Sequence, residues 1–117
     1  MIKTARGLSI AATATTALLL GVTNAGATAQ YEDFVEWTRS CGTTYAGVVT
    51  KTKAVTGKGN NGSCKGDAWL GVKYKAGNWS EWRHETDQAV FKNSDGNIVK
   101  AVHKGCADCK KYYTEIP

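Results

Sequence analysis

The cysteines and one nearby histidine are the residues whose spacing could most directly carry chemistry. Cys106 and Cys109 are separated by two residues, and His103 stands three residues before Cys106. A Cys-x-x-Cys pair can act as a thiol–disulfide catalyst where a helix N-terminus lowers the thiol pKa. With Cys64 as a further ligand, the same spacing could hold zinc. Because the flanking residues are strand-like and the chain carries an export signal, described below, we expect a structural disulfide instead.

The cysteines number four, and an even count in a small exported domain argues for two disulfides. Three pairings are open, and the sequence alone does not choose between them. We favour Cys41–Cys64 together with Cys106–Cys109. In the chain-entropy treatment the first bridge would contribute about 3 kcal/mol and the second about 2 kcal/mol to stability. A chain this short needs such links because it buries a smaller fraction of its surface than a large domain does.

A second polar group, formed by His84, Glu85 and Asp87, is a candidate for acid–base catalysis. Neighbouring residues of a strand point to opposite faces, so His84 and Glu85 cannot converge. Catalysis would also require a positioned partner, such as an activated serine or a second carboxylate. We therefore predict that the protein is not an enzyme and has no cofactor and no metal site. We expect neither His84 nor His103 to lie in a concave pocket within hydrogen-bond reach of a carboxylate.

Aromatic and lysine side chains give the clearest indication of binding. The chain has four tryptophans, and a thin β fold cannot easily bury them all. Exposed aromatic side chains on a sheet can form a flat surface for a glycan or a protein. The alternative is that the tryptophans are ordinary core residues. The predicted binding residues are Trp69, Lys73, Lys75, Trp79, Tyr112 and Tyr113.

The elements that would position these side chains are short strands. Residues 68–76 alternate between apolar side chains and a second set that contains Trp69, Lys73 and Lys75, as in a strand with one buried face. Threonine and valine favour strand structure in residues 43–56. Glycine and asparagine predict a loop at residues 57–66 and a hairpin turn at residues 93–96. Further strands are expected at residues 79–86, 89–92, 97–103 and 110–116. This pattern predicts a small antiparallel β-sandwich or barrel.

Residues 30–41 allow two interpretations. In a short helix, which we favour, one face would hold Tyr31, Phe34, Val35 and Thr38. Acidic residues toward the start would suit the helix dipole. In an extended arm, alternation would instead place Tyr31, Asp33, Val35 and Trp37 together.

Residues 1–29 have the three parts of a secretory signal peptide. Lys3 and Arg6 give a positive start, residues 8–22 are apolar or small, and Ala27-Thr28-Ala29 forms a cleavage site. The apolar run is shorter than the roughly 20 residues that a membrane-spanning helix needs. We therefore predict that residues 30–117 form a single secreted domain with no membrane span.

The charge of the chain argues against a nucleic-acid partner. The net charge is +5, and loss of Lys3 and Arg6 with the signal peptide would leave +3. Such a mild charge with interspersed acids is typical of a soluble surface. Nucleic-acid binding would require a denser basic stripe with several phosphate contacts.

The segment CGTTYAGVV at residues 41–49 resembles the start of spore-associated protein A, a family of small secreted actinobacterial proteins. The segments GNIV at residues 96–99 and GCAD at residues 105–108 are similar to the last hairpin and cysteine of that family. The chain departs from the family because Cys109 follows Cys106 so closely. The resemblance implies a disulfide-bonded β fold at the cell or spore surface, without enzymatic activity.

These features predict a small secreted protein that acts by binding. It would be an extracellular structural or adaptor component that docks on a cell-wall or other cell-surface element or on a co-secreted protein assembly. The alternative is a secreted antagonist, either an antibacterial toxin component or an enzyme inhibitor, that presents residues 57–64 as a rigid loop.

Overall fold

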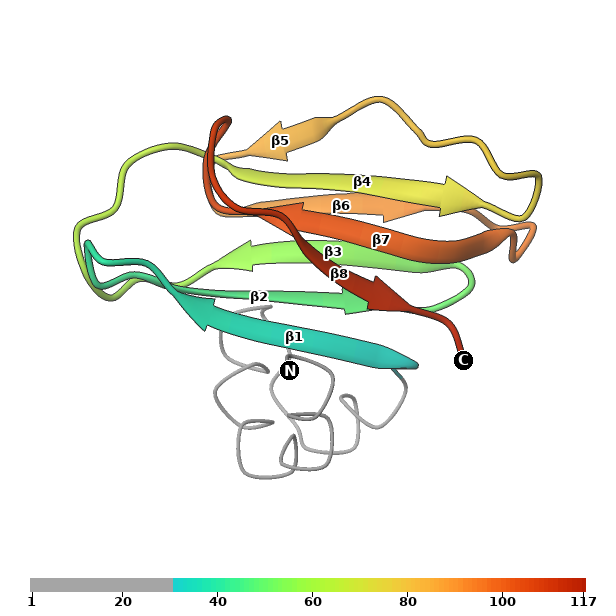
Figure 1. Ribbon diagram of the computed structural model, residues 1–117, viewed down its shortest axis with the longest axis horizontal. Helices are drawn as coiled ribbons and strands as arrows, with labels where there is room; N and C mark the ends of the chain where they lie inside the picture. The colour runs from blue at the N-terminus through green and yellow to red at the C-terminus, as the bar shows by residue number, and fades with distance from the viewer. Residues whose placement is uncertain (1–30) are drawn as a thin grey trace.

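The computed structural model describes residues 31–117, in which two antiparallel sheets pack face to face (Figure 1). Sheet A has the order β1 (Asp33–Thr38), β2 (Thr44–Val49), β3 (Lys53–Lys58) and β6 (Gln88–Lys92). Sheet B has the order β5 (Arg83–Glu85), β4 (Ala68–Tyr74), β7 (Ile98–Lys104) and β8 (Tyr112–Glu115). The predicted β-sandwich with two disulfides is confirmed. The predicted signal peptide, residues 1–29, lies outside the described residues.

The short helix favoured for residues 30–41 was a wrong prediction, because this segment contains strand β1. β1 pairs with β2 from Asp33 opposite Val49 to Thr38 opposite Thr44. Its alternate residues Asp33, Val35 and Trp37 are buried, as the extended alternative required. Pairing and the burial of Trp37 between the sheets outweigh the local helical signals, because strand preference is set mainly by packing.

The region 43–56, expected to be strand throughout, is divided into β2 and β3 by a tight turn. The backbone N–H of Thr50 donates to the carbonyl of Lys53 at 2.7 Å. Threonine side chains complete the turn in place of the usual glycine or asparagine, and the Thr50 hydroxyl accepts from the N–H of Thr52. The predicted loop at residues 57–66 begins later than expected, because β3 continues to Lys58.

The interior between the sheets is built from small and branched apolar side chains at alternate strand positions. Its main cluster consists of Val49, Ala54, Leu70, Val72, Ala89, Ile98 and Ala101. An aromatic cluster fills one end, where the Trp37 ring stacks on those of Tyr45 and Tyr112 with centroids 5.5 and 4.3 Å apart. Burial of these side chains is the main force that holds the two sheets together.

A fully buried histidine links the two sheets. His103 Nδ1 lies 2.8 Å from the Thr56 hydroxyl on β3, and Nε2 lies 2.8 Å from the Thr114 hydroxyl on β8. Gly47 provides the room, since a Cβ there would lie 2.4 Å from the imidazole. Burial lowers the pKa of His103 to about 3, against the opposing effect of the Asp33 charge. The imidazole is therefore neutral at ordinary pH and forms a hydrogen-bonded link within the core.

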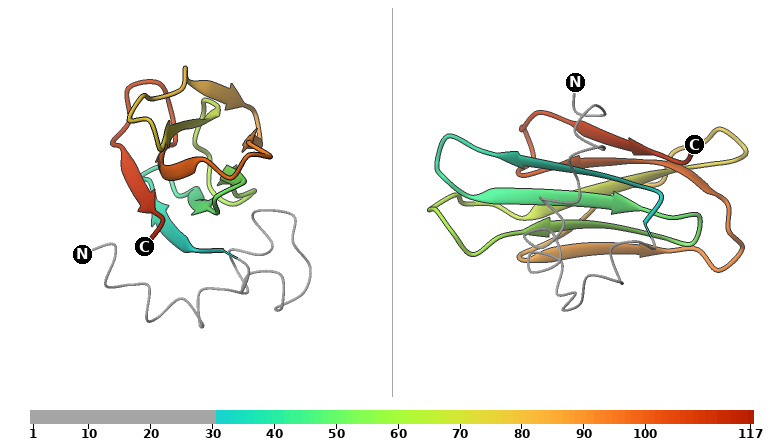
Figure 2. Two further views of the ribbon diagram at one scale, coloured as in Figure 1. Left: turned by 90° about the vertical axis from the view of Figure 1, so that its right-hand side faces the viewer. Right: turned by 90° about the horizontal axis from the view of Figure 1, so that it is seen from below.

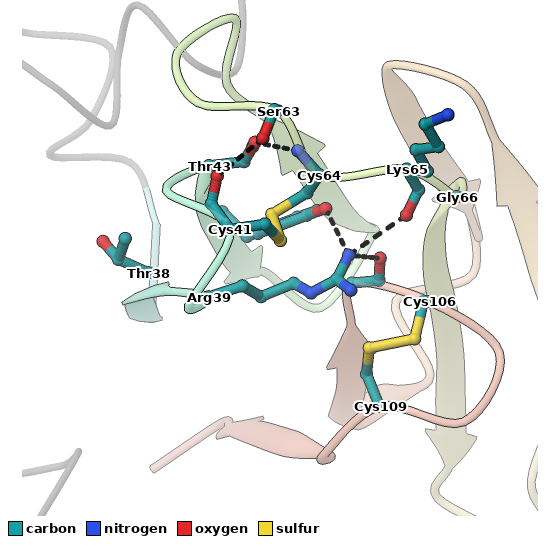
Figure 3. The surroundings of a disulfide bond; sticks show 12 residues. Thr38, Arg39, Cys41, Thr43, Ser63, Cys64, Lys65, Gly66, Cys106 and Cys109 are labelled. Atoms are coloured by element: carbon teal, nitrogen blue, oxygen red, sulfur yellow. Dashed lines mark hydrogen bonds between the residues drawn. A yellow bond between two sulfur atoms is a disulfide. The ribbon is translucent and has the colours of Figure 1, made fainter.

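The two predicted disulfides, Cys41–Cys64 and Cys106–Cys109, are both present and lie at the same end of the sandwich (Figure 3). Between them the guanidinium of Arg39 gathers three segments. Its Nη1 lies 3.2 Å from the Tyr45 hydroxyl and 3.1 and 3.2 Å from the carbonyl oxygens of Lys65 and Gly105. These contacts fix the loops before β4 and after β7 relative to β1.

The open edges of the two sheets approach each other on both sides. β1 and β8 lie side by side (Figures 1 and 2), and the Asp33 carboxylate accepts from the backbone N–H of Glu115 at 3.0 Å. At the other side, Arg83 on β5 donates to the carbonyl of Val90 on β6 at 3.3 Å. The same guanidinium lies 4.4 Å from the centroid of the Phe91 ring. Side chains thus cover edges that would otherwise be open to pairing with another chain.

Candidate binding face

The outer face of sheet B collects side chains from all four of its strands or their flanking segments. Pairing sets Trp69 on β4 opposite Lys104 on β7, and Lys73 opposite Lys100. Val102 on β7 lies opposite Tyr113 on β8. Because side chains alternate along a strand, all of these point away from the core. We name this surface the aromatic–lysine face and define it as Trp69, Lys73, Trp79, Trp82, Lys100, Val102, Lys104, Lys111 and Tyr113.

Two of its tryptophans come from the segment between β4 and β5. Trp79 forms an isolated bridge with Lys73, and the N–H of Ser80 donates to the carbonyl of Val72 at 2.7 Å. Trp82 lies over Gly71 in the middle of β4. A Cβ at residue 71 would lie 3.8 Å from the indole and 3.0 Å from Val102 Cγ1. A side chain at residue 71 would therefore crowd Val102, while the indole would lie at ordinary contact distance.

The face holds the large hydrophobic side chains that remain exposed in the described part of the chain. These are Trp79, Tyr113 and Trp82, which are 43%, 41% and 39% exposed. The rings of Trp79 and Tyr113 meet edge to face with centroids 6.3 Å apart. A cluster of exposed aromatic residues on a rigid sheet is typical of a binding surface, whereas scattered ones are ordinary.

Lys104 lies between two indoles and is only 7% exposed. Its Nζ is 4.0 Å from the Trp82 centroid and 5.0 Å from the Trp69 centroid. The ammonium donates to the carbonyl of Ala107 at 2.6 Å. Burial and the nearby charge of Lys111 lower the pKa of Lys104, while Asp108 acts in the opposite direction. Cation–π attraction of this kind is strongest where water is excluded.

A shallow groove lies on the face and is bordered by Lys111. It has a volume of about 220 Å³ and is lined by Trp79, Val102, Lys111 and Tyr113. Lys111 Nζ lies 6.0 Å from the Trp82 centroid, and Lys100 Nζ lies 5.1 Å from the Tyr113 centroid. Glu115, opposite Lys100, is an acid on the same strand face. Lysines therefore dominate the charge around the groove.

Four of the six predicted binding residues lie on this face, namely Trp69, Lys73, Trp79 and Tyr113. Tyr112 does not, because it is the inward neighbour of Tyr113 and stacks on Trp37. Lys75 lies in the turn after β4, where its N–H donates to the carbonyl of Asn97. Alternation along residues 112–115 allows only one of the two tyrosines to face outward.

The sequence-based prediction omitted Trp82, Lys100, Val102, Lys104 and Lys111. Part of this set was detectable, since alternation along the predicted strand 97–103 puts Lys100 and Val102 on one face, and one more residue adds Lys104. Trp82 gave no such signal, because its place depends on the path of the segment between β4 and β5.

The histidines lie in contrasting surroundings. His84 on β5 stacks on Trp69 with centroids 4.1 Å apart, and its Nδ1 lies 2.8 Å from the Asp67 carboxylate. It therefore does reach a carboxylate, contrary to one part of our expectation. The pair is at an edge strand, with side chains 49% and 36% exposed. The two hydrogen bonds of His103 described above are both with threonine hydroxyl groups.

The cysteines that could have formed a zinc or redox site are joined in disulfides. Cys106 and Cys109 bond to each other, which removes the thiolates that metal binding would use. In residues 31–117, no three His, Cys, Asp or Glu side chains are grouped so that they could hold a metal ion. The same residues contain no helix that could cross a membrane.

Comparison of the chain with protein-family models, curated proteins and solved structures finds no match in any of the three. The resemblance to spore-associated protein A therefore stays a prediction. Function has to be inferred from the geometry of the aromatic–lysine face.

Proposed function

We propose that the protein is a secreted, non-enzymatic binding protein that docks on an extracellular partner through the aromatic–lysine face. Its role would be that of a structural or adaptor component on a cell-surface element or a co-secreted assembly. One observation carries this proposal: Trp79, Trp82 and Tyr113, exposed and aromatic, gather on one face among lysines.

Physical reasons favour such a role for this face. Aromatic side chains dominate the energetics of many interfaces because they bury a large area with little loss of conformational freedom. Here Tyr113 stands on β8, and the segment that carries Trp79 and Trp82 is bonded to β4 at Lys73 and Val72, so binding would require little ordering of the backbone. Two disulfides also suit a protein that works in an oxidising space outside the cytoplasm.

The alternative role as an antagonist would use residues 57–64 as an inhibitory loop. This loop is held firmly, since the Thr43 hydroxyl donates to the carbonyl of Asn61 and Thr44 N–H donates to the Asn61 side chain. Gly62 presses against the backbone of residues 42–43, where a Cβ would lie 2.2 Å from the nearest atom. The loop thus folds back on the chain instead of presenting an extended segment to a protease, and we prefer the adaptor role.

A retention experiment with paired lysine variants tests the proposal. The purified, disulfide-bonded protein is incubated with the cell envelope and secreted proteins of the producing cells, and the retained fraction is measured. Lys73→Ala with Lys100→Ala removes two lysines that lie opposite each other on the outer face of sheet B. Lys53→Ala with Lys92→Ala removes an equivalent pair from sheet A and is the matched control.

We expect the sheet B pair, and Trp79→Ala with Tyr113→Ala, to lower retention several-fold, and the sheet A pair to leave it unchanged. Thermal melting should show that all three variants are folded. Equal retention of every variant would reject the face as the docking surface. Retention that depends on Asn60 or Ser63, with protease inhibition or bacterial killing by the wild type, would favour the antagonist.

A further inference from the structure

Two lysine ammonium groups converge on one indole at the centre of the aromatic–lysine face. Lys104 Nζ lies 4.0 Å and Lys111 Nζ lies 6.0 Å from the Trp82 centroid. Burial and, after it, the charge of Lys111 lower the pKa of Lys104, so the two like charges repel. An anion placed between them would relieve the repulsion and gain two charge-assisted hydrogen bonds.

The two ammonium groups also have the donors that such an anion would need. Each ammonium carries three N–H groups. Lys104 uses one of them for the carbonyl of Ala107, which fixes its position. Lys111 is exposed and lines the adjoining groove. A fixed ammonium near an exposed one can bind an acid group.

The groove next to this pair offers an aromatic surface for an uncharged ring. Trp79, Tyr113 and Val102 line it together with Lys111. Lysine ammonium groups lie over the rings of Trp69, Trp82 and Tyr113, whereas none of the described residues places one over Trp79. Trp79 therefore has the ring most open to a ligand, within a space of about 220 Å³.

From these features we propose that the aromatic–lysine face binds an anionic glycan. The acid group lies between Lys104 and Lys111, and the adjoining sugar ring packs on Trp79 and Tyr113. This inference rests on the proposed binding function and names the chemistry of the partner.

A glycan fits this surface better than a single-stranded nucleic acid. Bases bind successive aromatic platforms, each with a free ring face. Here lysines already lie over three of the four rings, which leaves one platform among several cations. One sugar with an acid group matches that arrangement.

Lysine in place of arginine leaves the kind of acid open. Arginine is the usual partner where a planar carboxylate must be held bidentately, while lysine acts as a point charge toward carboxylate or phosphate alike. The test therefore includes both. The probes are hexagalacturonate for carboxylate, a phosphomannan oligosaccharide for phosphate, maltohexaose as the neutral glycan, and oligothymidylate as the nucleic acid.

Binding is measured by tryptophan fluorescence titration and calorimetry with the disulfide-bonded protein. We expect at least one acidic glycan to bind, to bind more weakly as salt is raised, and to outcompete maltohexaose and oligothymidylate. Lys111→Ala should weaken binding about tenfold, the usual effect of losing a hydrogen bond to a charged group. Lys110→Ala is the matched control, because this neighbouring lysine lies over the inward Tyr112 instead. Trp79→Ala should weaken binding to a similar degree.

Four outcomes would overturn the inference. Maltohexaose binding as tightly as the acidic glycans would show that the acid group is not recognised. Tighter binding of oligothymidylate would assign the face to nucleic acid. Equal affinities of Lys110→Ala and Lys111→Ala would remove the anion site. If retention of the natural partner still depends on Lys73 and Lys100 while no acidic glycan binds, the glycan inference fails and the proposed function stands.

Discussion

Consecutive residues on β7 show how differently the two sides of one strand can use polar groups. His103 points inward, and both ring nitrogens have hydroxyl partners from Thr56 and Thr114. Lys104 points outward, where one carbonyl and two indole rings surround its ammonium. Both ring nitrogens of His103 have hydrogen-bond partners within the fold, while the ammonium of Lys104 retains N–H donors that a ligand can use.

This contrast separates polar residues that serve the fold from those that we propose to serve binding. A buried polar group whose partners all belong to the fold specifies the packing of the core. A cation held in place beside exposed aromatic rings instead prepares a surface for a partner. Variants should therefore affect stability on the inner side and binding on the outer side.

The largest expected effect comes from filling the space beside His103. Gly47→Ala would place a methyl group 2.4 Å from the imidazole, so either the ring or β2 must move. Overpacking of this severity should lower the free energy of unfolding by about 3 kcal/mol. Urea denaturation followed by tryptophan fluorescence measures the loss.

The double variant Gly47→Ala, His103→Ala is the control for this effect. Removal of the ring should recover part of the loss, so the two changes should not be additive. Additive destabilisation would show that the His103 ring is not the reason why position 47 requires glycine.

Removal of each disulfide should further distinguish effects on stability from effects on binding. Cys41→Ser with Cys64→Ser opens a loop of separation 23 and should lower the free energy of unfolding by about 3 kcal/mol. Cys106→Ser with Cys109→Ser should lower it by about 2 kcal/mol, because the loop is much shorter. Only the second pair should also weaken ligand binding, since its turn carries Ala107 and leads to Lys111. If loss of either disulfide weakened binding equally, the turn closed by Cys106–Cys109 would have no special role in the binding face.

Acid should lower the stability of the fold through protonation of His103. Its folded pKa of about 3 lies below the ordinary value of 6.5, so the unfolded chain takes up the proton first. The stability contribution is full above pH 6.5 and is lost as the pH falls toward 3. Between pH 8 and pH 5 the free energy of unfolding should drop by about 2 kcal/mol.

The exposed histidine supplies the control for the pH experiment. His84→Asn should keep the acid-dependent loss in urea midpoints, and His103→Asn should flatten it. A wild type that is equally stable at pH 8 and pH 5 would contradict the neutral, buried state of His103.

The smallest effect on stability is expected for Lys104→Met, which keeps the long side chain but removes the charge. Replacement of a largely buried charge by an apolar side chain of similar length should change the free energy of unfolding by less than about 1 kcal/mol. Binding of an acidic glycan should still fall about tenfold, since the fixed ammonium is lost. A loss of stability as large as that of Gly47→Ala would make Lys104 a structural residue like His103.

Much of the fold was predictable because it depends on local rules. Alternation along residues 68–74 put Trp69 and Lys73 on the face where they are found. Asn93–Gly96 forms a turn, but the expected hairpin was wrong, because β6 and β7 belong to different sheets. The preferred cysteine pairing is confirmed. In β1 the correct alternation was visible but was ranked below a helical pattern. What decides that segment is the stacking of Trp37 on Tyr112, a residue distant in sequence.

The binding face was harder to predict for the same reason. Trp82 comes to lie on Gly71 because the segment from Trp79 runs antiparallel beside β4, with Trp79 opposite Lys73 and Arg83 opposite Leu70. Lys104 and Lys111 become neighbours through the turn that the short disulfide closes. Alternation within one strand assigns a side chain to a face, but not to its neighbours from other strands.

The contact between Asp33 and Glu115 has a consequence for how the chain folds. It joins residues 82 positions apart, so β1 gains its second neighbour only when β8 has been made. Long-range closure of this kind slows folding, because loop entropy is lost before the last contacts form. The last residues of the chain must therefore be synthesised before this edge of the sandwich can close.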